Sequence, residues 1–319
     1  MSIAVVGASG LVGEKLTQIL ADKLPNTPLL LYGNTSVGQR VFLNGRAHKI
    51  RPISQILADK PNYAMFMANE EIAKEYVPQL SKTCVCVDNS SAFRLAPDVP
   101  LVVPQINGQT VGNKKVIANP NCTTIQVVIA LAALKSLKPQ AMTVATYQSV
   151  SGAGRDGLCD LQEKHQYGKL KSFSHPIFDN LIAQIGEILP DGTTVEEQKM
   201  RNETRKILDL PHLYVNSFCV RVPVSVGHGA FVNVTFNEPF EIEQVRELLK
   251  KEQDVLLFEN DRLPMPQVLR QTHFVGVGRL SKDERGGLNM FVVADNLLRG
   301  AAYNAYQILQ ISMKNNGDV

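Results

Sequence analysis

Cys122 is the side chain of this sequence best placed to act as a nucleophile. It ends the motif Asn-Pro-Asn-Cys at 119–122, between a strand predicted over 116–118 and an apolar helix predicted over 122–137. At a helix start, the helix dipole and unpaired backbone N–H groups stabilise a thiolate, so the pKa of the thiol falls. A lone cysteine is more commonly an inert buried thiol, but this position favours covalent catalysis.

His228 is the histidine best placed to exchange a proton with such a cysteine. Imidazole is the usual general acid or base near neutral pH. Of the six histidines, His228 lies in a glycine turn between two predicted strands, where its side chain can project into a cleft. The other five are predicted to be surface or packing residues. Cys84 and Cys86 have no partners elsewhere that would make them metal ligands, so no metal is predicted.

The segment Gly7–Gly13 is typical of a dinucleotide-binding loop. Its glycines have the spacing GxxGxxG, directly after a strand predicted over 3–6 and before a helix predicted over 11–21. Such glycines allow a tight turn, let the backbone approach a pyrophosphate, and let helix and strand pack closely. The alternative is a glycine-rich turn without a ligand. We predict cofactor contacts from Gly7, Ser9, Gly10, Leu11, Val12 and Gly13.

A nucleophilic cysteine together with a nicotinamide cofactor indicates aldehyde oxidation through a thioester. For the choice of cofactor, the end of the second predicted strand (29–32) is informative. It carries no Asp or Glu for the ribose hydroxyls of NAD. The polar residues Asn34, Thr35 and Ser36 follow it instead. The sequence therefore favours NADP, with some use of NAD.

The elements that position these residues predict an α/β protein of two domains, since 319 residues exceed the size of one typical domain. Up to residue 121, short strands alternate with helices, which indicates a Rossmann-like parallel sheet covered on both faces. The strands are predicted over 3–6, 29–32, 64–67, 84–87, 101–103 and 116–118. After residue 121, the sequence predicts an α+β domain with a mixed, largely antiparallel sheet. Its strands are predicted over 142–150, 218–223, 230–236, 274–280 and 288–294. We expect an exposed helix over 194–208 and a packed amphipathic helix over 296–313.

The composition excludes several classes of protein. The formal net charge is +3 and no dense basic run occurs, which argues against a nucleic-acid partner. The longest apolar stretch, 125–134, is about half a membrane span, and the first residues lack the basic region of a signal peptide. Five cysteines argue against a secreted disulfide scaffold. We expect a cytoplasmic protein that binds neither nucleic acid nor a membrane.

The chain resembles the aspartate-semialdehyde dehydrogenase family along nearly its whole length. The shared motifs lie, in order, at 7–13, 88–94, 119–122, 148–154, 196–200 and 221–228. The resemblance implies the reversible NADP-dependent reductive dephosphorylation of L-aspartyl 4-phosphate to L-aspartate 4-semialdehyde, in lysine, threonine and methionine biosynthesis. It also implies a homodimer, an NADP-binding domain over 1–121 and 297–319, and a catalytic and dimerisation domain over 122–296.

The same resemblance implies a role for individual residues. Cys122 would carry the acyl group, His228 would be the general acid/base, and Gln148 would orient the acyl intermediate. Recognition of the substrate α-carboxylate and amine would fall to Arg221 and Glu196. The site for inorganic phosphate would comprise Arg94, Asn121 and Lys199. Further cofactor contacts would come from Ser151, Gly152 and Asn296.

Two places depart from the family pattern. Thr35 stands where NADP-using members commonly carry Arg, which predicts a smaller preference for NADP. Gly229 and Ala230 stand where the family often has Ser and an acidic residue, next to the catalytic histidine, which predicts slower turnover. Two alternatives remain: a dehydrogenase like N-acetylglutamyl-phosphate reductase, and a catalytically inactive dinucleotide-binding sensor. The presence of both Cys122 and His228 argues against the sensor.

Overall fold

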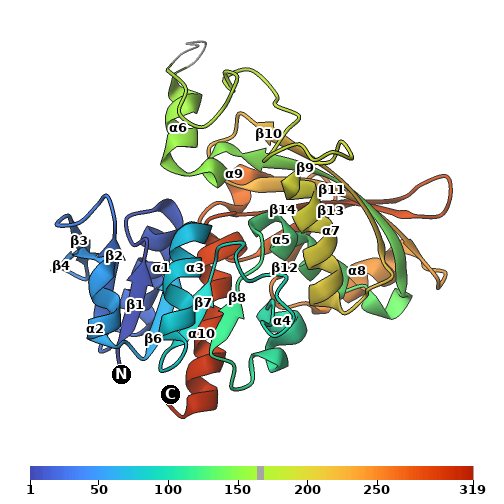
Figure 1. Cartoon of the computed structure of the whole chain (residues 1–319). Coiled ribbons are helices and arrows are strands. Elements are labelled where there is room, and N and C mark those ends of the chain that lie inside the picture. The colour runs from blue at the N-terminus through green and yellow to red at the C-terminus, as the bar shows by residue number, and fades with distance from the viewer. Residues whose placement is uncertain (164–168, 319) are drawn as a thin grey trace. The chain divides into compact units, whose positions relative to one another are not determined.

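The computed structural model describes residues 1–163 and 169–318 (Figure 1). It divides into two compact units. Unit 1 comprises Met1–Pro120 and Ala301–Val319, and unit 2 comprises Asn121–Gly300. Each unit has its own six-stranded sheet.

The sheet of unit 1 has the strand order β5-β2-β1-β6-β7-β8, and every neighbouring pair is parallel. This confirms the predicted Rossmann-like sheet. Its strands are β1 (Ile3–Val6), β2 (Leu29–Gly33), β5 (Arg51–Pro52), β6 (Tyr63–Phe66), β7 (Val85–Asp88) and β8 (Val116–Ala118). A hairpin of β3 (Arg40–Leu43) and β4 (Arg46–Lys49) lies between β2 and β5 in the chain.

Helices cover both faces of this sheet, as Figure 1 shows. Because side chains of a strand alternate between its faces, Ile3 and Val5 join one apolar cluster while Ala4 and Val6 join another. The first cluster contains residues of α1 (Leu11–Lys23) and α10 (Tyr303–Asn316), and the second contains residues of α2 (Ile56–Asp59) and α3 (Glu70–Leu80). Burial on both faces explains why the central strands β1 and β6 are apolar throughout.

The sheet of unit 2 is mixed, as predicted, with the order β10-β9-β11-β14-β13-β12. The outer pairs β10–β9 and β12–β13 are parallel, and the three pairs between them are antiparallel. Its strands are β9 (Pro139–Ser149), β10 (Tyr214–Val222), β11 (His228–Phe236), β12 (Val255–Phe258), β13 (Val275–Lys282) and β14 (Leu288–Ala294).

One face of this sheet is covered, and the other exposes aromatic side chains. The helix α5 (Cys122–Ala132) contacts β11, β13 and β14, and α7 (Val195–Leu208) contacts β10 and α5. On the opposite face Tyr147, Phe218 and Phe231 are exposed, and the ring of Tyr147 lies 6.0 Å from that of Phe291. We call these four residues the aromatic face. The remaining helices of eight or more described residues in unit 2 are α6 (Gly154–Gln162) and α8 (Ile242–Lys251).

Several predicted elements are corrected by the structure. Residues 101–103 form a single bridge, Leu101 to Ala118, in place of a strand. The helix predicted over 122–137 ends at Ala132, and a 3-10 turn at Lys135–Leu137 follows it. Lys138 then takes a left-handed conformation before Pro139, which starts β9; a residue before proline is disfavoured in a helix. The helix α8 and the strand β12 were not predicted. A short π-helix at Leu298–Ala302 precedes α10 (Tyr303–Asn316).

The helix α7 is not exposed, contrary to the prediction. One of its faces is buried, and that face carries Glu196, Met200, Glu203 and Ile207. Its many charges suggested a solvated helix, but buried carboxylates are tolerated when hydrogen bonds satisfy them.

Among the described residues, no helix is both long and apolar enough to cross a membrane.

Candidate active site

Cys122 is the first residue of α5 and is partly exposed. Asn121 caps this helix, since its Oδ1 accepts the backbone N–H groups of Thr123 at 2.9 Å and Thr124 at 3.2 Å. The cap fixes where the helix begins and therefore places the Cys122 sulfur in the first turn, where the helix dipole favours a thiolate. A Cβ on Gly300 would lie 2.9 Å from the Cys122 Cβ, so only glycine fits beside the cysteine.

Glu196 joins three of the other predicted site residues. Its Oε1 accepts the Asn121 side-chain amide at 2.8 Å and the Gln148 amide at 3.2 Å. Its Oε2 lies 3.5 Å from the Lys199 Nζ, one helical turn along α7. The structure thus brings Asn121, Gln148, Glu196 and Lys199 together beside Cys122. Among them only Lys199 keeps substantial exposure, at 29% of its side chain.

Glu203 belongs to this cluster but was not predicted. It is 1% exposed and accepts the backbone N–H of Asn121 at 2.7 Å. Glu196 and Glu203 are seven residues apart, which is two helical turns, so both carboxylates lie on the same face of α7. That spacing was the signal in the sequence that could have identified Glu203. The same helix starts with a capping box between Thr194 and Glu197.

His228 is the first residue of β11 and is fully buried. Gly227 before it has φ +100, a conformation that favours glycine. The ring Nδ1 accepts the Ser149 backbone N–H at 2.9 Å and lies 3.0 Å from the Ser149 Oγ. Since Nδ1 accepts a backbone hydrogen, the neutral ring carries its proton on Nε2. Among the described residues no partner contacts that Nε2.

Burial, followed by the positive charge of Arg221, lowers the pKa of His228 well below its usual range. The imidazole is therefore neutral at pH 7. A neutral ring with a hydrogen on Nε2 can donate that hydrogen to an oxygen that develops negative charge.

Arg221 stands on β10 directly beside Gln148 on β9. It is 6% exposed, and its Nη1 donates to the Ser149 carbonyl at 2.7 Å. Burial lowers the pKa of the guanidinium, whereas negative charge at Glu196 and at Cys122 raises it. Ser149 thus bonds to both residues: its backbone carbonyl accepts from Arg221, and its backbone N–H donates to His228.

Ser151, Gly152 and Asn296 were predicted to contact the cofactor, and in the structure they surround His228. The Asn296 Oδ1 accepts the Gly227 N–H at 2.8 Å, and its Nδ2 donates to the Ser151 hydroxyl at 3.0 Å. A Cβ on Gly152 would lie 2.7 Å from the Arg221 Nη1 and 3.4 Å from the His228 Nε2. The glycine leaves the space that these two side chains occupy.

The glycine loop of unit 1 has the geometry that a pyrophosphate requires. A Cβ on Gly7 (φ +79) would overlap the Met67 carbonyl, and a Cβ on Gly13 would overlap the Gly7 carbonyl. Gly10 is the N-cap of α1, and no side chain of the described residues caps that helix. The first N–H groups of α1 can therefore serve an anion. The loop residues fit a bound dinucleotide.

The remaining predicted residues of unit 1 differ in exposure. Asn34 and Thr35 are exposed after β2. Ser36 is buried, and its Oγ accepts the Ser9 hydroxyl at 2.8 Å. Arg94 is 7% exposed and donates from Nη2 to the Asn89 carbonyl at 2.7 Å. Arg94 belongs to unit 1, whereas the other predicted substrate residues belong to unit 2.

Gly229, one of the departures from the family pattern, has a packing reason. A Cβ there would lie 2.9 Å from the ring of Phe291. Gly229 pairs with Tyr147 across the sheet, on the aromatic face. Ala230 points to the opposite, covered side and is fully buried.

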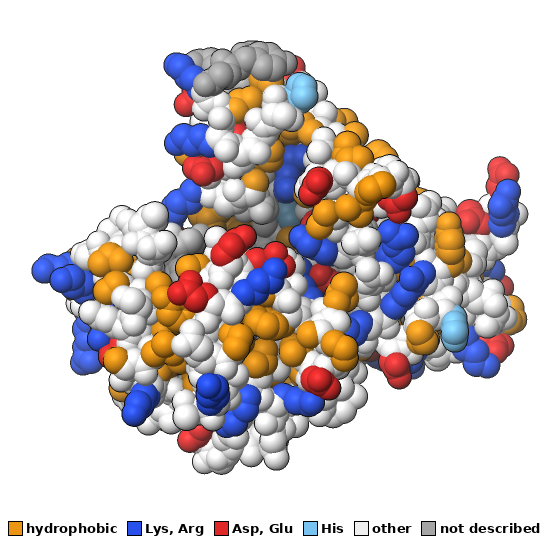
Figure 2. Space-filling view, viewed as in Figure 1, with side chains coloured by type: hydrophobic (Ala, Val, Ile, Leu, Met, Phe, Trp, Pro, Cys, Tyr) orange, Lys and Arg blue, Asp and Glu red, His pale blue; other side chains and the backbone are white. Residues whose placement is uncertain are grey.

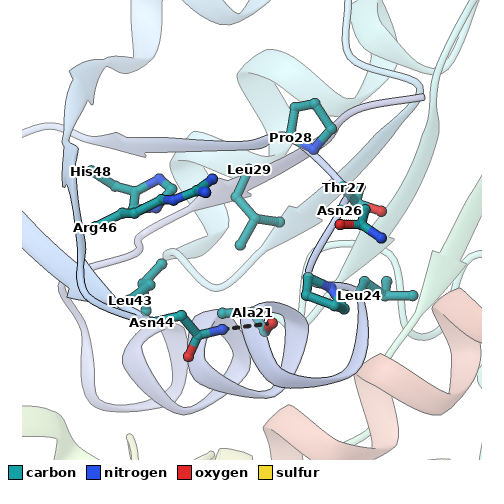
Figure 3. Close-up of a pocket in the computed structure, with 11 residues that line it drawn as sticks. Ala21, Leu24, Asn26, Thr27, Pro28, Leu29, Leu43, Asn44, Arg46 and His48 are labelled. Carbon is teal, nitrogen blue, oxygen red and sulfur yellow. Dashed lines mark hydrogen bonds between the residues drawn. The ribbon is translucent and has the colours of Figure 1, made fainter.

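A cavity of about 510 Å³ lies elsewhere in unit 1, at the C-terminal end of α1 (Figure 3). The loop 25–28 and the β3–β4 hairpin line it, with Arg46 and His48 side by side. Asn44 closes one side by donating to the Ala21 carbonyl at 2.9 Å. None of the predicted site residues lines this cavity.

Matches to known proteins, in sequence and in structure, span nearly the whole chain. The family described as "Semialdehyde dehydrogenase, NAD binding domain" matches residues 2–114, and "Semialdehyde dehydrogenase, dimerisation domain" matches residues 131–299. Over 98% of both chains, the sequence is 37% identical to an aspartate-semialdehyde dehydrogenase of Aquifex aeolicus and 36% identical to aspartate-semialdehyde dehydrogenase 2 of Vibrio cholerae. Among solved structures, aspartate semialdehyde dehydrogenase II of Vibrio cholerae complexed with ASA is 34% identical, with a TM-score of 0.94 over 98% of both chains.

Proposed function

Because the chain belongs to the aspartate-semialdehyde dehydrogenase family, we propose that it interconverts L-aspartyl 4-phosphate and L-aspartate 4-semialdehyde through a thioester on Cys122. The observation that carries the proposal is the cluster in unit 2. Cys122 starts a helix whose cap is bonded to Glu196, and Ser149 connects Arg221 with His228. The product would serve the synthesis of lysine, threonine and methionine, in the cytoplasm.

The first step is addition of the Cys122 thiolate to the aldehyde carbon. The dipole of α5 and the positive charge of Arg221 both favour the thiolate over the thiol. As the carbon–sulfur bond forms, the aldehyde oxygen becomes negative, and the Nε2 hydrogen of His228 is available to it. When bound, the nicotinamide dinucleotide supplies the hydride acceptor for this oxidation. Phosphate then adds to the thioester carbon, and the thiolate leaves to give the acyl phosphate.

His228 works as the general acid/base of both addition steps. The Ser149 N–H holds the hydrogen on Nε2, so the ring shares this hydrogen with the oxyanion as it forms, and the hydrogen returns fully to Nε2 when the oxyanion collapses. The low pKa of His228 keeps the ring neutral throughout the neutral pH range, so the same Nε2 hydrogen is available in both steps. Ser149 is a positioning residue for this cycle.

Substrate recognition falls to the charged groups around the cysteine. Arg221 keeps Nη2 and Nε without an acceptor among the described residues, so they can bind the substrate α-carboxylate. Glu196 would accept the substrate amine, and Gln148 beside it would orient the acyl group. Asn121 and Lys199, with Arg94 of unit 1, would bind inorganic phosphate.

The cofactor proposed is NADP, with measurable use of NAD. The NAD-binding family match of unit 1 and its glycine loop support a dinucleotide. The segment 34–36 offers hydroxyl and amide donors without a carboxylate that would repel a 2′-phosphate. Contacts to the cofactor are proposed from Gly7–Gly13, Asn34–Ser36, Ser151, Gly152 and Asn296.

A homodimer is proposed through the aromatic face of unit 2. The dimerisation family match spans this sheet, and exposed aromatic rings are enriched at protein interfaces. Sedimentation of the wild-type chain should give twice the monomer mass. Phe231→Lys should shift the equilibrium toward the monomer without unfolding the chain. A wild-type monomer at micromolar concentration would refute the homodimer, and a dimer unaffected by Phe231→Lys would refute this interface.

The experiment that tests the reaction is phosphate-dependent reduction of NADP with L-aspartate semialdehyde. N-acetylglutamate semialdehyde, the substrate expected for the alternative reductase, is assayed beside it. We expect turnover with the first aldehyde, dependence on phosphate, and an added acyl mass on Cys122 when phosphate is omitted. Turnover with only the second aldehyde would contradict the substrate, and turnover without any acyl mass would contradict the thioester.

A further inference from the structure

The segment that follows α6 is held by a buried carboxylate. Asp160 of α6 is 0% exposed. It accepts the backbone N–H groups of Lys171 at 2.7 Å, Ser172 at 2.8 Å and Phe173 at 3.0 Å. A buried charge is costly unless hydrogen bonds satisfy it. Three such bonds to consecutive residues therefore fix the backbone of 171–173.

The far end of the same segment is fastened to the strand that carries Arg221. The Ile182 N–H donates to the Arg221 carbonyl at 3.1 Å, and the Arg221 N–H donates to the Ile182 carbonyl at 2.8 Å. Residues 169–194 and the neighbouring β10 expose the apolar side chains of Phe178, Leu181, Ile188, Tyr214 and Phe218, and apolar side chains gather on the surface of unit 2 in Figure 2. The segment 171–182 is thus tied at both ends.

Held in this way, the Phe173 side chain contacts the side chain of Arg221. The guanidinium carbon lies 5.7 Å from the centre of the Phe173 ring, within the range of a cation–π contact. An aromatic ring carries no carbonyl or carboxylate acceptor, so this contact does not compete for the N–H groups, which point outward in the guanidinium plane. Nη1 is already bonded to the Ser149 carbonyl. The remaining in-plane donors stay available for a carboxylate.

We propose that Phe173 is a positioning residue for recognition of the substrate α-carboxylate, acting through Arg221. The ring restrains the guanidinium and keeps water from its face, and Asp160 holds the ring in place. The inference rests on the proposed function, in which Arg221 binds that carboxylate. It gives a role in specificity to residues 171–182, which lie outside the helices and strands of the sheet.

The test compares two aldehydes and two variants of the full chain. Phe173→Leu removes the ring and keeps an apolar side chain, whereas Phe173→Tyr keeps the ring. With L-aspartate semialdehyde, we expect Phe173→Leu to raise KM about three- to thirtyfold, the range between an exposed and a desolvated cation–π contact, and to change kcat less than twofold. Phe173→Tyr should restore KM. With 3-aminopropanal, which lacks the α-carboxylate, kcat/KM should be the same in all three proteins.

Two results would overturn the inference. One is an unchanged KM for L-aspartate semialdehyde in Phe173→Leu; the other is an equal loss with both aldehydes, which indicates general packing. In an Arg221→Lys background, Phe173→Leu should have no further effect on KM. If Phe173→Leu unfolds, Phe173→Met replaces it as a variant of similar volume. A wild-type chain inactive toward L-aspartate semialdehyde would refute the proposed function itself, independently of the Phe173 comparison.

Discussion

The glycine loop of unit 1 and the proposed catalytic cluster of unit 2 are built on different physical principles. The loop offers backbone N–H groups and empty space, and Asn34 and Thr35, which follow β2 in the same unit, are exposed. The cluster consists of buried polar side chains that hydrogen bonds hold in place: Gln148, Glu196, Arg221 and His228 are 2%, 8%, 6% and 0% exposed.

This difference predicts how each region responds to substitution. In the cluster, removing one partner leaves a buried group unsatisfied and disturbs its neighbours. In the loop after β2, a new side chain can add a contact without removing one. Effects should therefore be large and mostly negative in unit 2, and small and adjustable in unit 1.

The largest effect is expected from Cys122→Ala, which removes the nucleophile at the helix start. Turnover should fall by several orders of magnitude while the thermal unfolding midpoint stays close to that of the wild type. Cys159→Ala is the matched control, because Cys159 is also a free and partly exposed cysteine on a helix. A folded Cys122→Ala protein with normal turnover would refute the covalent mechanism.

His228→Ala should be the next most harmful change. We expect kcat to fall by about 10²–10⁴, the usual contribution of general acid–base catalysis, with KM altered much less. His228→Gln keeps an N–H donor but cannot exchange a proton, so it separates hydrogen bonding from proton transfer. His212→Ala, at an exposed histidine, is the control. If KM rises and kcat does not fall, His228 binds substrate and another group moves the proton.

The protonation of His228 gives a second test of the buried cluster in unit 2. Because the pKa of His228 is lowered well below 6.5, protonation of this ring should not reduce kcat between pH 8 and pH 6.5. For stability, the unfolded chain binds a proton on this histidine below about pH 6.5 and the folded chain does not, so folding is weakened as pH falls below that value. Urea unfolding should show a smaller loss between pH 7.5 and 5.5 in His228→Gln. An equal loss in both proteins would contradict a neutral buried ring.

Arg221→Lys should have an intermediate effect. Lysine keeps the charge but loses the planar fork and the Ser149 contact, so kcat/KM for L-aspartate semialdehyde should drop by about 1–3 kcal/mol of transition-state stabilisation. Steady-state kinetics with saturating phosphate and NADP measure this change in kcat/KM. Near-normal kinetics would mean that Arg221 acts as a point charge.

The smallest effect is expected in unit 1, from Thr35→Arg. A charged hydrogen bond is worth about 1.5–3 kcal/mol against about 1 for a neutral one, so the arginine should widen the preference for NADP severalfold. The ratio of kcat/KM values with NADP and NAD measures it. Arg40→Ala is made in parallel. If wild type already uses NADP alone, Thr35→Arg changes nothing and Arg40→Ala weakens NADP, then Arg40 holds the 2′-phosphate.

The sequence predicts unit 1 well because its structure depends on local patterns. Short β-branched runs and helical spacing locate the strands and helices, and the glycines of the loop are required by contacts with backbone that lies close in the fold. The family motifs point to Asn121, Gln148, Glu196, Lys199, Arg221 and His228. The structure joins the first four through Glu196 and the last two through Ser149, which follows Gln148 on β9.

What the sequence did not predict depends on contacts between distant segments. The charges of α7 indicated an exposed helix, since nothing in the local sequence shows that Glu203 meets the Asn121 backbone or that Glu197 accepts the Cys219 N–H at 2.9 Å. The contact of Phe173 with Arg221 comes from a segment without periodicity. The seven-residue spacing of Glu196 and Glu203 indicates a shared helix face, but the partners of such buried polar groups come from distant segments and have no local sequence signal.

The packing of Gly229 against Phe291 has a consequence for any larger residue at position 229. A serine Cβ there would lie 2.9 Å from the tip of the Phe291 ring, so the ring would have to move to admit it. Because Phe291 belongs to the aromatic face, a change beside His228 on one side of the sheet would be felt as a shift of a ring on that face.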